Sequence, residues 1–113
     1  MQVHIFDHSD YEYLRWLAQN RFGFVVNTPR ALDPDYMMLH RAGCNTISEY
    51  HGNAERGGFT EREYIKICAN DIESLRAWVR QNGRPDGSFS SMCQHCDPLH
   101  NWEDDDDDWI TER

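Results

Sequence analysis

The sequence has no long apolar run. Its uninterrupted apolar stretches are only a few residues long, whereas a membrane-spanning helix needs about 20 such residues. The N-terminal residues MQVHIFDHSD also lack the basic region and apolar stretch of a secretory signal. We therefore expect a protein with no membrane contact that works in the cytoplasm, either of a bacterium or, for a phage protein, of its host.

The motifs of several large enzyme classes are also missing. The sequence contains no Gly-x-Ser-x-Gly, no phosphate-binding loop and no His-Glu-x-x-His. Nor does it have the His-x-Glu that a zinc deaminase carries before its Cys-x-x-Cys. We therefore expect no enzymatic activity.

Lysine is nearly absent, because Lys66 is the single lysine among 11 basic residues. The 20 acidic residues give a net charge of -9. Residues 103–113 hold -6 of this charge, and residues 1–102 hold the remaining -3. A net-acidic body argues against non-specific DNA binding, which needs clustered basic groups that release counterions.

A length of 113 residues fits one domain. We expect residues 1–100 to form a single zinc-stabilised α+β domain and residues 101–113 to form an acidic, flexible tail. The composition is 39% hydrophobic, with 12% aromatic residues. That suffices for a modest core, and domains of this size often need a further staple such as a metal or disulfide.

Apolar periodicity and turn residues predict a small, mostly antiparallel sheet with two helices. The main strands are expected at residues 22–26, 36–39 and 64–67, and a short one at 2–6. Helices are expected at residues 10–20 and 71–82, because Ser9 with Glu12 and Asn70 with Glu73 have the spacing of capping boxes. Residues 48–60 look like an exposed loop with a hinge at Gly57-Gly58.

The four cysteines are the strongest chemical signal. Cys93-Gln94-His95-Cys96 places two thiolates within reach of one metal ion. Two further ligands must come from elsewhere, and His40 and Cys44 have suitable spacing at a strand end. Cys68 is the alternative to His40 as the fourth ligand. A redox pair or four unconnected core thiols are the competing interpretations.

Residues 36–98 resemble the Ada-type zinc-binding domain of methylphosphotriester DNA repair proteins. The similarity lies in a ligand-x3-Cys turn at His40 and Cys44, a strand, a helix, and a terminal Cys-x-x-Cys-x-Pro ending at Pro98. The chain also resembles small uncharacterised bacterial and phage zinc-binding proteins. The resemblance implies a structural zinc. Because His40 stands where that family has its methyl-accepting cysteine, it argues against alkyl transfer.

An acid run flanked by tryptophans follows the Cys-x-x-Cys. Its candidate partner-binding residues are Trp102, Asp104, Asp105, Asp106, Asp107, Asp108 and Trp109. The tail is either a solubilising segment or an interaction segment with tryptophan anchors.

Three functions remain open. The first is a non-enzymatic, zinc-stabilised binding module with an unknown protein partner. The second is an acidic nucleic-acid mimic that inhibits a DNA- or RNA-processing or defence enzyme, as phage anti-defence proteins do. The third is an Ada-like nucleic-acid-binding domain, which the net charge disfavours.

Overall fold

A computed structural model describes residues 2–49 and 57–98. These residues form two helices and a five-stranded sheet with the strand order β1-β4-β2-β3-β5. All strand pairs are antiparallel except β3 with β5. The elements are β1 (His4–Phe6), α1 (Asp10–Gln19), β2 (Phe24–Pro29), β3 (Met38–Arg41), a 3-10 turn (Asn45–Ile47), β4 (Tyr64–Ala69), α2 (Ile72–Asn82) and β5 (Ser91–Met92). The predicted α+β class is confirmed.

Each helix begins at a side-chain cap. The Ser9 hydroxyl accepts a hydrogen bond from the Glu12 backbone N–H at 3.1 Å, as the sequence predicts. The α2 cap differs from the prediction by one residue. Asp71, not Asn70, is the cap, and its carboxylate accepts from the Ser74 N–H at 2.7 Å. An ionised side chain suits this place because a helix N-terminus is electropositive.

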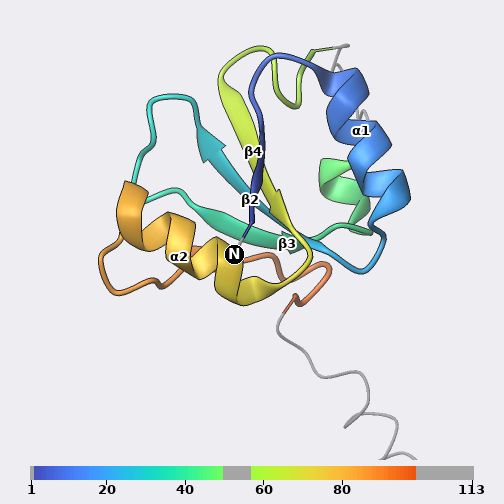
Figure 1. Ribbon diagram of the computed structural model, residues 1–113. Helices are drawn as coiled ribbons and strands as arrows, with labels where there is room; N and C mark the ends of the chain where they lie inside the picture. The colour runs from blue at the N-terminus through green and yellow to red at the C-terminus, as the bar shows by residue number, and fades with distance from the viewer. Residues whose placement is uncertain (1, 50–56, 99–113) are drawn as a thin grey trace, which may run out of the picture.

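The two helices lie on opposite sides of the strands (Figure 1). Because side chains alternate along a strand, each face of the sheet has its own core. The α2 side buries Val26, Leu39, Ile67, Leu75 and Val79 among other apolar residues. The α1 side buries Tyr13, Trp16, Val25 and Cys68, together with Cys44 and Cys93. The candidate ligand cysteines therefore adjoin the α1-side core.

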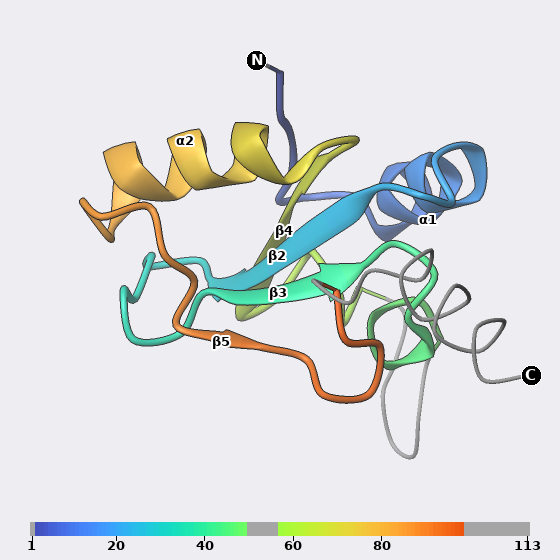
Figure 2. The ribbon, with the colours of Figure 1, turned by 90° about the horizontal axis from the view of Figure 1, so that it is seen from below.

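Strand β5 was not predicted from the sequence. It is only two residues long and pairs in parallel with β3, Met38 lying opposite Ser91 and Leu39 opposite Met92. Figure 2 shows the two strands side by side. The pairing continues into the cysteine turn, because the Cys93 N–H donates to the Leu39 carbonyl at 2.9 Å. This short strand therefore aligns the Cys-x-x-Cys segment with the end of β3.

Three local expectations were wrong. The strand expected at residues 36–39 is β3, which begins at Met38 and continues to Arg41. Phe22 was placed in a strand, but β2 begins at Phe24 and the Phe22 side chain is 95% exposed. The expected exposed loop at residues 48–60 ends in buried residues, since Gly57, Phe59 and Thr60 are all buried. Residues 50–56 of that loop lie outside the described residues. Within the described ranges, no helix is long and apolar enough to cross a membrane.

Candidate metal centre

Four potential ligands come together where β3 and β5 end. The ligand atoms of His40, Cys44, Cys93 and Cys96 all lie within 4.8 Å of one another. Three of these residues are buried, and Cys96 is half-buried. The cluster could hold a metal ion such as zinc, because imidazole and thiolate are the ligands zinc prefers in structural sites.

The end of β3 brings His40 and Cys44 together. His40 lies opposite Val25 of β2 in the antiparallel register. The chain then turns, and the Cys44 N–H donates to the Arg41 carbonyl at 3.0 Å. Ala42 ties the turn to the preceding segment, because its N–H donates to the Gly23 carbonyl at 2.9 Å. His40 thus lies near the end of β3, and the tight turn that follows the strand accounts for the four-residue spacing to Cys44.

Backbone and side-chain contacts hold the Cys93–Cys96 turn against β3. The Asp97 N–H donates to the Cys93 carbonyl at 2.9 Å, and Asp97 has a left-handed φ of 44°. The Arg41 N–H donates to Cys96 Sγ at 3.2 Å. Arg41 Nε also donates to the carbonyls of Cys96 and Asp97, at 3.0 and 3.2 Å. The turn is therefore positioned by one arginine as well as by its own hydrogen bonds.

His40 is the most informative member of the cluster. Its side chain is 4% exposed, and neither ring nitrogen has a hydrogen-bond partner among the described residues. Burial, with a smaller effect from Lys66, lowers the pKa of His40 to about 4. The ring is therefore neutral at pH 7 and keeps a nitrogen lone pair that a metal ion can take up. Buried polar atoms of this kind nearly always have a partner, so the unpartnered nitrogens make His40 suitable as a metal ligand.

The thiols respond differently to their surroundings. Burial raises the pKa of Cys96, although the Arg41 N–H opposes this. Burial also acts to raise the pKa of Cys93, but hydrogen bonds from the backbone of Cys96 and His95 outweigh it, and the pKa lies below its ordinary value. The Thr46 hydroxyl lies 2.9 Å from Cys44 Sγ, which is hydrogen-bond distance. A bound cation would favour the thiolate at every one of these positions.

The spacing of the sulfurs fits a tetrahedral ion. Zinc bonds of about 2.3 Å to sulfur and about 2.0 Å to nitrogen place neighbouring ligand atoms about 3.5 to 3.8 Å apart. Cys44 Sγ and Cys93 Sγ are 3.9 Å apart. With the outer limit of 4.8 Å for the whole cluster, small side-chain movements would close the tetrahedron. The residues present therefore fit a closed four-ligand zinc site.

Cys68, the alternative fourth ligand, lies elsewhere. It is opposite Val25 on the other side of β2 from His40, so two strand spacings, or about 10 Å, separate their backbones. The Cys68 side chain is fully buried in the α1-side core, and burial raises its pKa. It therefore packs as a small apolar residue.

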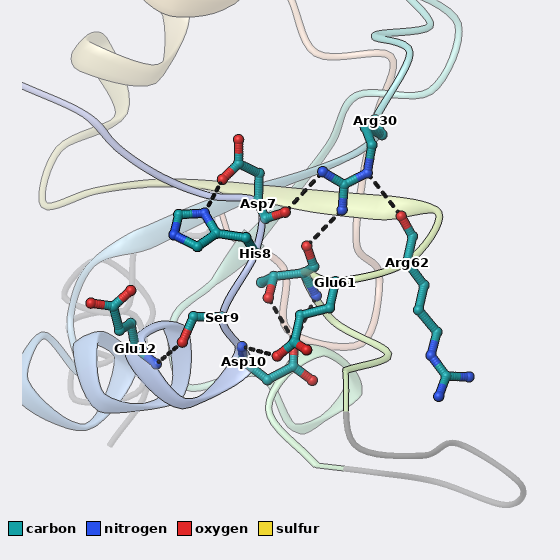
Figure 3. Close-up of polar contacts among 9 residues, drawn as sticks. Asp7, His8, Ser9, Asp10, Glu12, Arg30, Glu61 and Arg62 are labelled. Carbon is teal, nitrogen blue, oxygen red and sulfur yellow. Dashed lines mark hydrogen bonds and ion pairs between the residues drawn. The ribbon is translucent and has the colours of Figure 1, made fainter.

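A second polar centre, which the sequence analysis did not predict, lies at the start of α1. The buried Asp10 carboxylate accepts hydrogen bonds from the backbone of Gly57 and Thr60, both at 2.7 Å, and of Phe59 at 3.3 Å. It also accepts from the Thr60 hydroxyl at 2.7 Å. In return Glu61 Oε2 accepts from the Asp10 N–H at 2.9 Å (Figure 3). We call this group the Asp10 latch, because it fastens the segment before β4 to α1.

Lys66 lies next to the latch and is 3% exposed. Its ammonium group donates to the Phe59 carbonyl at 2.7 Å and lies 5.8 Å from the ring centres of Tyr13 and Phe59. Burial lowers the pKa of Lys66 to about 8, although Asp10 and Cys68 oppose this. The only sequence signal was that the single lysine alternates with apolar residues in β4.

The surface beside the metal centre is hollowed. One hollow of about 680 Å³ is lined by Phe22, Arg21, Arg41 and the ligands Cys44 and Cys96, among others. A second, of about 370 Å³, lies along α1 and is lined by Leu14, Leu17, Ala18, Arg21, Ala42, Gly43 and Ser48. Arg21 and Gly43 line both, so the two hollows are neighbours, and we call them together the Phe22 hollow.

The predicted partner-binding residues, from Trp102 to Trp109, lie outside the described residues. No protein-family model, curated protein or solved structure matches the chain. The likeness to the Ada-type domain therefore rests on the ligand spacing, and what the structure adds is the buried cluster of one histidine and three cysteines.

Proposed function

We propose that the protein is a non-enzymatic binding module whose fold is held together by one zinc ion. His40, Cys44, Cys93 and Cys96 would be the four ligands. The observation that carries the proposal is the convergence of these ligand atoms around a buried imidazole with two unpartnered nitrogens. Bound zinc would supply cross-linking of segments distant in sequence, since the ligands come from β3, the following turn and the segment after β5.

The donor set supports a structural rather than a catalytic ion. A catalytic zinc keeps one position open for water or substrate, whereas structural sites use four protein ligands. Here one imidazole and three thiolates would occupy all four positions. Arg41 and Thr46, which contact the sulfurs, hold the ligands in place and offer no general base to a substrate. An enzymatic role therefore has no support at this centre.

The partner is proposed to be a protein. The described surface beside the centre mixes Arg21 and Arg41 with Glu49 and Asp97, so it carries no excess of positive charge for a phosphate backbone. An exposed phenyl ring at Phe22 is instead the kind of apolar anchor found in protein interfaces. The acid run at Asp104–Asp108, with Trp102 and Trp109, would contribute the remaining contacts.

Cobalt substitution tests the closed site. We expect the Co²⁺ form of the full chain to show strong tetrahedral d–d absorption and thiolate charge-transfer bands. Addition of azide, a small anion that binds open metal positions, should leave this spectrum unchanged. Cys68→Ala is the matched control and should give the same spectrum. A spectrum that shifts with azide would indicate an open position and would contradict a purely structural ion.

Titration with labelled oligonucleotides tests the class of partner. Single- and double-stranded DNA and RNA, followed by fluorescence anisotropy at about 50 mM salt, are expected to show no binding to the zinc-loaded chain. Tight binding that weakens steeply as the salt concentration rises would indicate a nucleic-acid partner and would contradict the proposal of a protein partner.

A further inference from the structure

The Phe22 hollow has an apolar side along α1, and no segment among the described residues covers it. Its α1 side is formed by Leu14, Leu17 and Ala18. Its other side carries Phe22, the most exposed large apolar side chain of the described residues at 95%. Aromatic side chains such as this one are enriched in protein interfaces.

The described part of the chain ends beside this surface. Cys96 and Asp97 line the hollow, and the described part ends one residue later, at Pro98. Trp102 follows Asp97 by five residues, so its backbone reaches at most about 17 Å from the wall of the hollow. A tryptophan tethered this closely has a high effective concentration at the hollow, which favours docking within the same chain.

The side chains of the tail and those of the Phe22 hollow are also chemically complementary. The indole of Trp102 supplies a large apolar area for the α1 side of the hollow. Arg21, an exposed arginine at the junction of its two parts, can receive carboxylates of the acid run. Glu49 and Asp97 line the end near the metal centre, so repulsion would direct the aspartates toward Arg21 and away from that end.

We propose that residues 101–110 dock in the Phe22 hollow of their own chain, with Trp102 packed against Leu14, Leu17 and Ala18. The inference rests on the proposed function in one respect, because Cys44 and Cys96 shape one wall and the metal would fix them. It adds regulation to that function. The tryptophan and aspartates proposed to bind a partner are occupied when the tail is docked. A partner must therefore displace the tail from the hollow before it can bind.

Nuclear magnetic resonance of the full zinc-loaded chain tests the docking. The expected result is nuclear Overhauser effects between the Trp102 indole proton and the methyl groups of Leu14, Leu17 and Ala18. Ala18→Glu places a charge in the hollow at an exposed helical position, where folding tolerates it, and should abolish these effects. Gln19→Glu is the matched control. It adds one negative charge at the next exposed residue of α1, which lies outside the hollow, and should preserve the nuclear Overhauser effects.

Three outcomes would overturn the proposal. In the first, the Trp102 resonance equals that of a synthetic peptide of residues 99–113. In the second, the Overhauser effects persist in Ala18→Glu. In the third, they appear only between differently labelled chains, which would make a second copy the occupant. Zinc content is measured on the same samples. Zinc without docking contradicts this inference alone, whereas docking without zinc contradicts the proposed function alone.

Discussion

Replacing Asp10 by Asn should destabilise the protein strongly, although the two side chains have nearly the same shape. The Asp10 carboxylate is 2% exposed and accepts four hydrogen bonds. An amide has one oxygen in place of two. Its best orientation keeps that oxygen on Gly57 and Phe59 and turns the NH2 group toward Thr60, whose hydroxyl can rotate to accept. The Thr60 N–H then faces another donor.

The magnitude follows from these contacts. One buried N–H left without an acceptor costs about 1–3 kcal/mol. The two hydrogen bonds that remain lose their charge assistance, at about 1 kcal/mol each. Loss of a negative charge in the first turn of α1 adds about 0.5 kcal/mol. We therefore expect Asp10→Asn to lower the free energy of unfolding by about 3.5–5.5 kcal/mol.

Urea denaturation with zinc in fixed excess measures this difference. Glu12→Gln is the matched control, because Glu12 is an exposed acid in the same first turn of α1. It should cost well under 1 kcal/mol, since it loses only the helix-dipole contribution. If Asp10→Asn cost no more than Glu12→Gln, the latch would not be the anchor of the segment before β4.

Three further predictions concern other parts of the structure. The pKa of Lys66 falls from 10.5 to about 8 on folding. Between these pH values the unfolded chain binds more protons, so the free energy of unfolding should rise with pH. Urea titrations at pH 7 and pH 10 should show a rise of up to about 3 kcal/mol relative to Lys66→Met. Arg41→Ala keeps the hydrogen bond from the backbone N–H to Cys96 but loses the guanidinium contacts to the turn. Competition with a zinc chelator should show about 10- to 100-fold weaker zinc binding. An unchanged zinc affinity would exclude Arg41 as a positioning residue. Gly87 has a φ of 74°, in the left-handed region that favours glycine. Gly87→Ala should therefore lower the free energy of unfolding by about 1–2 kcal/mol, seen as a lower melting temperature, and a neutral effect would contradict the backbone strain.

The sequence predicted the elements that carry local signals. The Ser9 cap, the two amphipathic helices and the alternating strand at β4 follow from side chains close together in the chain. The two ligand pairs were recognised for the same reason, because His40 with Cys44 and Cys93 with Cys96 have short spacings.

The remaining features depend on distant contacts. Whether His40 or Cys68 joins the cysteines is decided by the strand order, which places β2 between β3 and β4. The two-residue strand β5 exists only because β3 offers it a free edge. The Asp10 latch joins residues about fifty positions apart, and an acidic residue at the start of a helix is ordinarily an exposed one. No local pattern distinguishes it.

Zinc content of the purified, reduced protein is the most direct test of the metal centre. The wild type and Cys68→Ala are expected to contain about one zinc per chain, since Cys68 lies in the α1-side core and away from the cluster. His40→Ala should lose most of this zinc, because it removes one of four ligands. Zinc retained in His40→Ala but lost in Cys68→Ala, or absent from every preparation, would contradict the account.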